Sequence, residues 1–348
     1  MGGMLAPLMV SLLALLLGHD EAELVFAGDA MMHQAQIDAA RTTGGDYDFT
    51  GYFDAIRPYV TTADYAVVNL ETPVSAMHRY SGYPCFNAPP AFVDALADAG
   101  FDLFLTANNH TLDRSDRGLR ATLDCLDARG HDHIGTYRTA AGRDSVHPLV
   151  RTLGGIRVGF LNYTYGTNGI TARDGAAVDY IDRGLIRSDV GRLREAGAEV
   201  IAACVHWGEE YKLLPAASQR SLGAFLRDSL GVELVIGSHP HVVQPMELSA
   251  DSTRLTVYSL GNFISNMRTR DTRGGAMVRV RLERGDDGRV RIADARYRLV
   301  FTEPAGAGRN FRLVWPDASG DSRAADFARA ARALFDKHNV GVPEHIAR

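Results

Sequence analysis

The sequence predicts an α/β fold in one catalytic domain, residues 23–348. Short runs of β-branched or aromatic residues end in polar loops, and stretches with helical apolar spacing often follow them. Strands that alternate with helices are typical of α/β architectures. We see no internal repeat and no long low-complexity linker in the sequence, so one domain is favoured over two.

The expected strands each end just before a polar segment, and they lie at 24–27, 65–68, 102–105, 157–161, 200–205, 234–236 and 255–258. The expected helices lie at 90–99, 119–128, 217–230 and 324–338. The first of these has Pro90 at its start and Gly100 just past its end, which are helix start and stop signals.

The pattern changes after residue 270. Residues 276–282 and 289–301 both show alternating apolar positions, and Gly285-Asp286-Asp287-Gly288 lies between them. Two alternating strands across such a turn predict an antiparallel hairpin.

Composition is that of a globular protein with a sizeable core and indicates no nucleic-acid partner. The chain has 348 residues, of which 46% are hydrophobic and 23% charged, with a formal net charge of -5. These values are ordinary for a globular protein. Arg is interleaved with Asp and Glu, whereas a nucleic-acid footprint needs basic residues clustered on one face.

The three cysteines, Cys85, Cys125 and Cys204, do not form a disulfide framework or a CxxC pair. A Cys85–Cys125 disulfide stays open if the protein is exported. We favour three buried thiols, because free Cys is among the most buried residue types.

The N-terminal segment contains a nearly continuous apolar run at 5–17. A membrane span needs about 20 residues, so a signal-peptide core fits better. No Lys or Arg precedes the run, and Gly18-His19-Asp20 is a poor cleavage site. We expect residues 1–22 to export or tether the protein outside the cytoplasm. The alternative is a misannotated start codon ahead of a cytoplasmic domain.

Residues of metal-ligand type follow strand after strand. In α/β sheets, ligands gather at the carboxyl ends of the strands. His239 and His241 lie two apart, so in an extended segment both imidazoles point the same way. The predicted metal ligands are Asp29, Glu71, Asn109, His206, His239 and His241.

Carboxylate, imidazole and amide ligands without a thiolate suit Mn, Zn or Fe. One or two divalent ions are expected, and two ions roughly 4 Å apart would share a bridging carboxylate. Taken singly, each residue has a simpler interpretation: Asp29 as a helix cap, Glu71 as a solvated turn residue, His206 as a core histidine. Their recurrence at strand ends favours the metal site.

Further polar residues are candidates for substrate contacts and for proton transfer. Tyr163, Thr164, Tyr165 and Asn168 follow a strand, and the alternative for them is a Gly-rich surface loop without function. Asn262 is a further candidate contact. Glu209 follows His206 closely and would either orient an imidazole or act as a general base.

The motifs resemble those of the CapA, or poly-γ-glutamate capsule-synthesis, family, whose fold is similar to that of calcineurin-like metallophosphoesterases. They run in family order over roughly residues 24 to 265. The matching stretches are Phe26–Met32, Val68–Pro73, Thr106–Asp113, His206–Tyr211, Gly237–Val242 and Ser259–Phe263.

The resemblance implies a metallophosphoesterase-like four-layer αββα sandwich with a dimetal site at one edge. It gives Glu71 the place of a bridging carboxylate and makes His110 the catalytic or charge-stabilising residue. One departure matters, because Met31 stands where phosphoesterases carry the histidine of a D-x-H motif. His33 lies two residues off register, so one metal position lacks a ligand.

The implied function is metal-dependent hydrolysis or transfer of a phosphoryl or γ-glutamyl group in capsule or cell-envelope polymer metabolism. The partners would be an anionic polymer or a small-molecule substrate, with a membrane synthesis complex. The alternatives are a non-catalytic envelope protein that binds an anionic polymer, and a plain cytoplasmic phosphoesterase.

Overall fold

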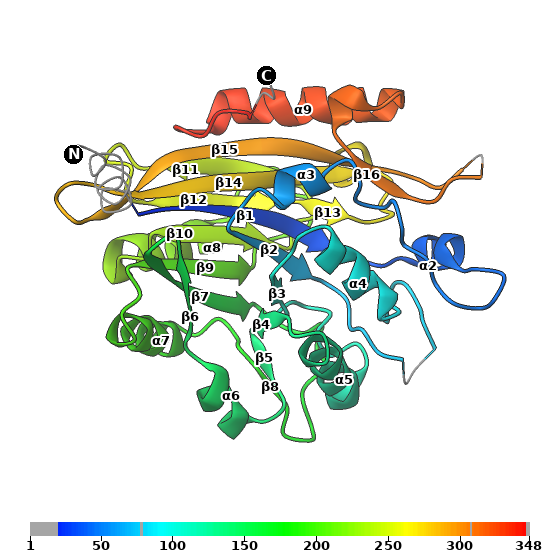
Figure 1. Cartoon of the computed structure of the whole chain (residues 1–348), viewed down its shortest axis with the longest axis horizontal. Helices are drawn as coiled ribbons and strands as arrows, with labels where there is room; N and C mark the ends of the chain where they lie inside the picture. Colours follow the sequence, from blue (N-terminus) through cyan, green and yellow to red (C-terminus); the bar gives the residue numbers. More distant parts are fainter. Residues whose placement is uncertain (1–19, 77–78, 307, 346–348) are drawn as a thin grey trace, which may run out of the picture.

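The computed structural model describes residues 20–76, 79–306 and 308–345. Two β-sheets pack face to face in the centre, and helices cover their outer faces (Figure 1). The expected four-layer αββα sandwich is therefore confirmed. The proposed export or tether segment lies mostly outside the described residues, and the first strand already begins at Glu21.

The first sheet has eight strands in the order β16-β15-β14-β1-β2-β3-β4, with β13 also paired to β1. Strands β1 to β4 are parallel, and β14 to β16 are antiparallel. Their bounds are β1 Glu21–Ala30, β2 Tyr65–Leu70, β3 Leu103–Leu105, β4 Asp132–Ile134, β13 Asn262–Ile264, β14 Gly274–Arg284, β15 Val290–Glu303 and β16 Arg312–Val314.

The second sheet has six strands in the order β11-β12-β10-β9-β7-β6, and its four inner strands are parallel. A two-stranded sheet, β5-β8, lies apart from both. The bounds are β5 Thr136–Tyr137, β6 Leu149–Leu153, β7 Ile156–Thr164, β8 Ala177–Val178, β9 Val200–His206, β10 Leu234–Ser238, β11 Val243–Leu248 and β12 Leu255–Leu260.

The central strands are buried on both faces. In β1, Leu24 and Phe26 point into the core between the sheets, whereas Val25 points into the core under the outer helices. Strands covered on both sides read as near-continuous apolar runs rather than alternating ones. This explains why these strands were predictable from short β-branched and aromatic runs.

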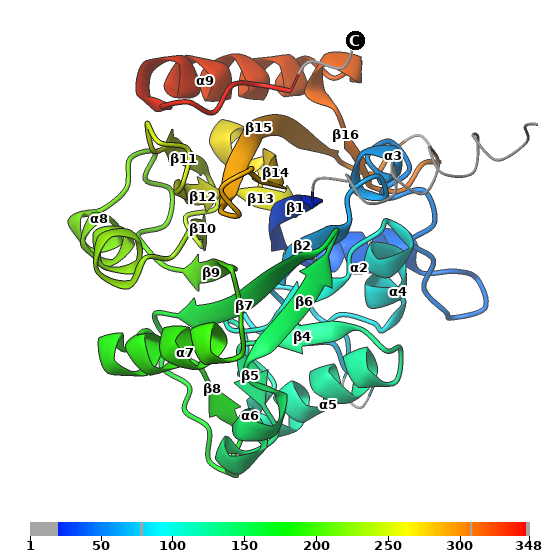
Figure 2. The ribbon, with the colours of Figure 1, turned by 60° about the vertical axis from the view of Figure 1, so that its left-hand side comes forward.

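Helices cover the first sheet on one side and the second sheet on the other (Figure 2). On the first sheet lie α2, α3, α4 and α5, through residues such as Ile37, Val60, Phe92 and Leu126. On the second lie α7 and α8, through Ile186 and Leu222. The helix bounds are α2 Gln34–Ala40, α3 Arg57–Val60, α4 Ala91–Asp98, α5 Ser115–Asp127, α6 Ala140–Val146, α7 Arg183–Glu195, α8 Ala217–Ala224 and α9 Ser322–His338.

The predicted hairpin is confirmed as β14 and β15, paired from Gly274–Phe301 to Arg284–Val290. The helix expected at 217–230 differs in one respect. It is α-helical to Ala224 and continues as a π-helical turn, η1 Phe225–Ser229. The C-terminal helix α9 lies along β15 and buries Phe327 and Phe335 in the central core (Figure 1).

The prediction of three buried thiols is wrong for one of them. Cys125 and Cys204 are buried, but Cys85 is exposed, and all three are free, so no Cys85–Cys125 disulfide forms. Cys85 lies in a surface turn closed by the bridge between Ser81 and Asn87, and its carbonyl accepts bonds from Ser81 and Arg114. The turn thus uses the Cys85 backbone and leaves its thiol in solvent.

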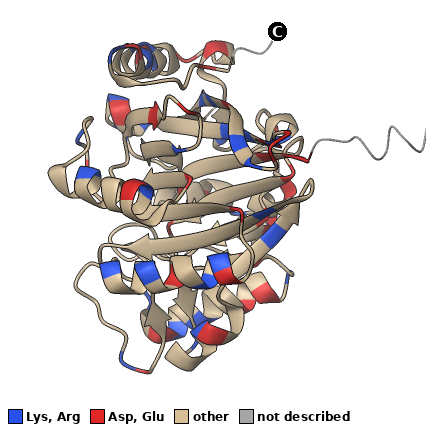
Figure 3. Ribbon diagram, turned by 90° about the vertical axis from the view of Figure 1, so that its left-hand side faces the viewer, with Lys and Arg blue, Asp and Glu red and all other residues tan. Residues whose placement is uncertain are grey.

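Basic and acidic residues are interspersed over the face shown in Figure 3. Many of them pair across elements, such as Arg194 with Glu233 and Arg284 with Glu199. Within the described ranges, no helix is both long enough and apolar enough to span a bilayer.

Candidate metal centre

Parallel strands of both sheets end at one edge, and this edge collects the predicted ligands. Asp29 is the second-last residue of β1, and Glu71 directly follows β2. His206 ends β9, and His239 directly follows β10. Because the two sheets face each other, ligands from the first sheet meet imidazoles from the second. Six side chains are buried there: Asp29, Glu71, Asn109, His206, His239 and His241.

The backbone is shaped to turn these side chains inward. The β1–β2 register shifts between Ala27 and Asp29, so Gly28 forms a bulge. A Cβ on Gly28 would stand 2.0 Å from the carbonyl oxygen of Gly261, so only glycine permits this approach. His239 and His241 have positive φ values of 99° and 57°, which non-glycine residues adopt mainly where surrounding structure enforces them.

Glu71 lies at the centre of the cluster. Its Oε1 is 3.6 Å from His206 Nε2 and 3.8 Å from His241 Nε2. Neither carboxylate oxygen has a hydrogen bond within the described chain, although both are buried. Burial, and then the neighbouring Asp29 carboxylate, raise the pKa of Glu71 well above its usual range. An unpaired buried carboxylate is costly, and a cation would remove that cost.

Two overlapping groups have the geometry of cation sites. Glu71, His206 and His239 form one, and Asp29, Glu71 and His241 form the other. In each group one ligand atom per residue lies within 4.8 Å of the others. Glu71 belongs to both, as a bridging carboxylate would. A third group joins the exposed Glu210 to His239 and His241, and Glu210 was not among the ligands predicted from the sequence.

His206 connects the asparagine to this cluster. Its Nε2 lies 2.8 Å from Asn109 Oδ1, and its Nδ1 lies 3.0 Å from Ser238 Oγ. Burial, and then His239 and His241, lower the pKa of His206 well below its usual value. Burial and His241 lower the pKa of His239 to about 3. The His206 and His239 imidazoles are therefore neutral, which is the form that binds metal.

Two buried neighbours orient the carboxylate and the imidazole of the Asp29–His241 pair. Asn69 Nδ2 donates to Asp29 Oδ1 at 2.8 Å. Asn262 Oδ1 lies 3.0 Å from His241 Nδ1, while its Nδ2 donates to the Thr272 carbonyl. Asn262, expected to contact substrate, thus holds a histidine in place. Asn69 was not predicted as a site residue. It lies on β2 two residues before Glu71, and this spacing could have indicated that both side chains face the site.

Met31 occupies the histidine position of the D-x-H motif, and His33 is the nearest histidine in the sequence. The Met31 side chain is buried. His33 Nδ1 accepts a hydrogen bond from the Asn266 backbone N–H at 3.2 Å. Burial, and then His241, lower the pKa of His33 to about 4. His33 is in none of the three candidate groups of the described chain.

His110 stands beside the cluster with a fixed orientation. Its Nδ1 lies 2.8 Å from Asp113 Oδ2, which also accepts the Phe86 backbone N–H at 2.7 Å. The Phe86 ring packs edge-on against the imidazole, with centroids 4.6 Å apart. Asp113 was not singled out from the sequence, although it lies within the motif that begins at Thr106.

The remaining predicted residues divide between the edge and the interior. Tyr165 is half exposed, and its ring lies 4.5 Å from that of His239. Asn168 Oδ1 accepts from Asn109 Nδ2 at 3.3 Å. Tyr163 instead packs in the core under α7 and donates to Asp189 at 2.7 Å.

Thr164 pairs with His206 across β7 and β9, whereas Glu209 lies in the loop after β9. Thr164 is buried, and its hydroxyl donates to the Gly166 carbonyl. Glu209 is exposed and belongs to none of the candidate groups among the described residues. The next residue, Glu210, takes that position instead.

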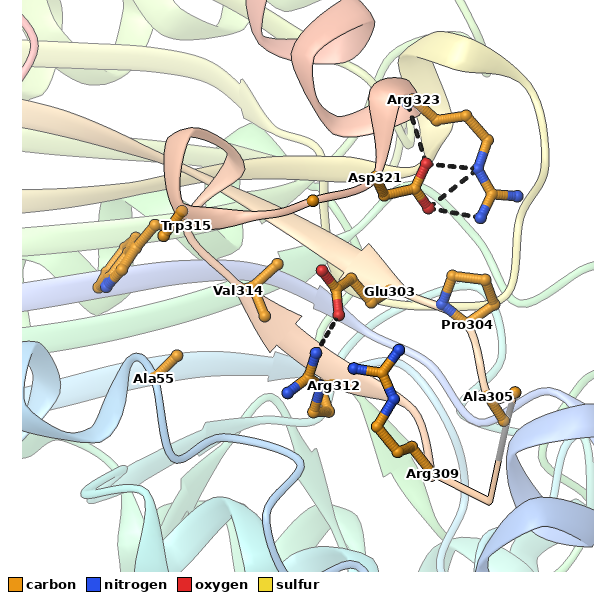
Figure 4. Close-up of a pocket in the computed structure, with 13 residues that line it drawn as sticks. Ala55, Glu303, Pro304, Ala305, Arg309, Arg312, Val314, Trp315, Asp321 and Arg323 are labelled. Atoms are coloured by element: carbon orange, nitrogen blue, oxygen red, sulfur yellow. Dashed lines mark hydrogen bonds and ion pairs between the residues drawn. The ribbon is translucent and has the colours of Figure 1, made fainter.

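Two cavities differ in their relation to this centre. One of about 560 Å³ shares Tyr165 with it. Another, of about 730 Å³, is lined by Arg309, Arg312 and Arg323 together with acidic side chains (Figure 4). There Glu303 pairs with Arg312 and Asp321 with Arg323, so most of its charge is compensated. No residue of the candidate metal groups lines it.

Solved structures resemble the chain only distantly. The calcineurin-like phosphoesterase YfkN from Bacillus subtilis is 13% identical, with a TM-score of 0.47, covering 91% of this chain and 98% of that one. The NAD nucleotidase NadN of Haemophilus influenzae is 11% identical, with a TM-score of 0.47, covering 95% and 65%. The four layers follow from the sheets and helices described above.

Comparison with known protein sequences identifies the family of the chain. The capsule biosynthesis protein CapA of Bacillus anthracis is 24% identical over 274 residues, which is 76% of this chain and 64% of that protein. The PGA biosynthesis protein CapA of Bacillus subtilis (strain 168) is 26% identical over 277 residues, or 77% and 69%. The chain thus spans about two thirds of the length of each relative. A family model for the bacterial capsule synthesis protein PGA_cap matches residues 23–267, well over half of the chain. The chain therefore belongs to the bacterial capsule synthesis protein family PGA_cap.

Proposed function

We propose that this protein is a metal-dependent enzyme that hydrolyses or transfers a γ-glutamyl group of a capsule polymer, with phosphoryl transfer as the other chemistry of such a centre. One observation carries the proposal: Glu71 is a fully buried carboxylate without a hydrogen bond in the described chain, surrounded by imidazoles. The choice of a γ-glutamyl group rests on family membership and on the named role of the Bacillus subtilis relative in PGA biosynthesis.

The residues present fit a divalent cation. Besides the two Glu71 oxygens, His239 Nδ1 is buried without a hydrogen bond in the described chain. Asp29, Glu71 and His241 would hold one ion, and Glu71, His206 and His239, with Asn109, would hold a second. Bound ions of this kind polarise the group under attack and acidify a water molecule. Mn, Zn or Fe suits this set of ligands.

The protein's own residues then supply orientation and proton transfer. Asp113 Oδ2 lies 2.8 Å from His110 Nδ1 and fixes the ring, so Nε2 is the nitrogen that would serve the substrate. An imidazole held in this way can exchange a proton with a leaving group. Asn109 and Asn168 bond to each other at the rim and fix the loop beside the substrate. Tyr165 covers the imidazoles and restricts access of bulk water to them.

The test is to measure bound metal in the purified protein and to assay a chromogenic phosphodiester and a γ-glutamyl amide. His206→Ala and His239→Ala should each lower metal content and reduce turnover by about 100-fold or more, since each removes a ligand. Turnover that survives unchanged in both variants would exclude the metal mechanism.

A second candidate is a non-catalytic protein that binds an anionic polymer during its synthesis or export. Met31 favours it, because it stands where the first motif of phosphoesterases carries an imidazole ligand. Tight polymer binding by a metal-free protein without turnover would support this candidate instead.

We also propose that the protein acts outside the cytoplasm, beside a membrane complex that makes the polymer. The support is the apolar run at 5–17 and the capsule-related family. Deleting residues 1–19, which leaves β1 intact, should move the protein to the cytoplasm, as cell fractionation would show. An unchanged location would favour a cytoplasmic enzyme.

A further inference from the structure

The cavity of about 560 Å³ meets the candidate metal centre at Tyr165. Tyr165 lines the cavity, and its ring also contacts His239, with centroids 4.5 Å apart. Trp207 lines it too and follows His206 in the chain. A substrate whose reacting bond lies at the metal cluster would therefore extend its neighbouring group into this space.

The cavity contains one cation and no acid. Arg183, at the start of α7, is the only basic residue among its lining residues, and no Asp or Glu of the described chain lines it. Arg183 forms no ion pair within the described ranges, whereas Arg192 and Arg194 on the same helix pair with Asp144 and Glu233. The positive charge of Arg183 is thus uncompensated at this place.

Local contacts hold the Arg183 guanidinium in position. Its Nη2 donates to Ser221 Oγ at 2.8 Å, and its Cζ lies 4.7 Å from the centre of the Phe225 ring. These contacts leave other N–H groups of the fork for a ligand. The hydroxyls of Ser218 and Ser221 also line the cavity and add donors.

The other walls are mostly apolar or aromatic, and the amide of the remaining polar residue, Gln219, is bonded to Ala216, Gln244 and Tyr258. Ile181, Leu222 and Trp207 line the cavity beside Tyr165. Such walls suit a short aliphatic segment, and the single guanidinium suits one carboxylate. A doubly charged phosphate would call for a second cation, and the lining residues supply none.

We propose that this cavity binds a carboxylate-bearing side group of the substrate, adjacent to the bond that reacts at the metal centre. This inference rests on the proposed function. It identifies Arg183 as the residue that selects substrates with a free carboxylate at that position.

The experiment measures binding of a γ-linked tetraglutamate to the full-length, metal-loaded protein by calorimetry, with an analogue whose α-carboxylates are amidated. Wild type should bind the acid about tenfold more tightly than the amide, as one charge-assisted contact would give. Arg183→Ala should lose this preference, and Arg183→Lys should keep part of it, because the charge remains without the fork.

Arg187→Ala is the matched control. Arg187 is also exposed on α7 and lies 5.4 Å from the Phe225 ring, but it does not line the cavity. The Arg187→Ala variant should bind the acid and the amide with the same affinities as wild type. Equal effects of the two alanine variants, or an acid preference that persists in Arg183→Ala, would overturn the proposal. Displacement of the acid by phenyl phosphate in an Arg183-dependent way would overturn the choice of carboxylate.

Different results would contradict the proposed enzyme and the proposed carboxylate site. Arg183-dependent binding without turnover of any γ-glutamyl amide would contradict the enzyme and leave the carboxylate site standing. Turnover that requires His206, combined with binding that ignores Arg183, would contradict the carboxylate site and leave the enzyme standing.

Discussion

At the scale of single residues, the direction in which each side chain points determines which residues can reach the candidate metal centre at the edge of the sheets. Glu209 and Glu210 are neighbours, yet only Glu210 offers an oxygen to His239 and His241. Tyr211, which follows them, has a φ of 67°, and its N–H donates to the Pro240 carbonyl. This contact joins the Glu210 loop to the His239–His241 turn.

Glu210→Gln should weaken metal binding by about tenfold, because it removes a charged oxygen beside two imidazoles. Glu209→Gln is the matched control and should leave metal affinity unchanged. Titration with Zn²⁺ or Mn²⁺, followed by calorimetry, measures both. Equal affinities for the two variants would show that the exposed Glu210 does not act as a ligand.

At the scale of elements, the bulge in β1 determines where Asp29 points. Gly28 lets β1 approach the segment before β13, where Asp29 N donates to the Gly261 carbonyl at 3.0 Å. Asp29 also pairs in register with Asn262 of β13. One close contact between two backbones therefore places a ligand from β1 and the asparagine that holds His241.

Gly28→Ala should lower the free energy of unfolding by about 3 kcal/mol, because the added Cβ meets a backbone oxygen that cannot move aside cheaply. It should also lower metal content, since Asp29 moves with the strand. The control is Gly320→Ala, where nothing lies within 4 Å of the added Cβ. Urea unfolding measures both variants, and equal stabilities would contradict the steric argument.

At the scale of the whole molecule, a buried ion network ties the outer helices to the second sheet. Arg143 of α6 pairs with Asp189 of α7 and with Asp179, and Tyr163 of β7 donates to Asp189. Burial opposes ionisation of Asp189, but bonds from His147, Arg143 and Tyr163 outweigh it and lower its pKa to about 2.

Asp189→Asn should cost about 3–5 kcal/mol near neutral pH, because it leaves Arg143 without one of its buried partners. The folded-state pKa lies below the ordinary value of 3.8, so this stability is present above that pH and is lost as the pH falls toward about 2. Urea midpoints at pH 7, 5, 4 and 3 should show the difference from wild type narrowing at the acid end. Asp98→Asn, an exposed change, should show no such trend. A difference that stays constant down to pH 3 would contradict the assignment.

Several elements escaped prediction for physical reasons. Edge strands such as β4 and β16 are three residues long and too short to show a period. Helix α7 is rich in charged residues, so its apolar stripe of Ile186, Val190 and Leu193 was not recognised. The interior position of Tyr163 had a usable signal, because it lies two residues after Leu161 on the same face of β7.

The sequence by itself determined the α/β class, the hairpin and the set of candidate ligands. Buried parallel strands leave apolar runs, and polar residues such as Asp29, Glu71 and His206 fall where those runs end. Only the tertiary structure decided that Glu71 stands between the two groups, that Glu210 rather than Glu209 faces the histidines, and that Arg183 and Tyr165 line one cavity. The physical reason is that strand ends follow from local pattern, whereas distances between side chains of different sheets depend on how the two sheets pack.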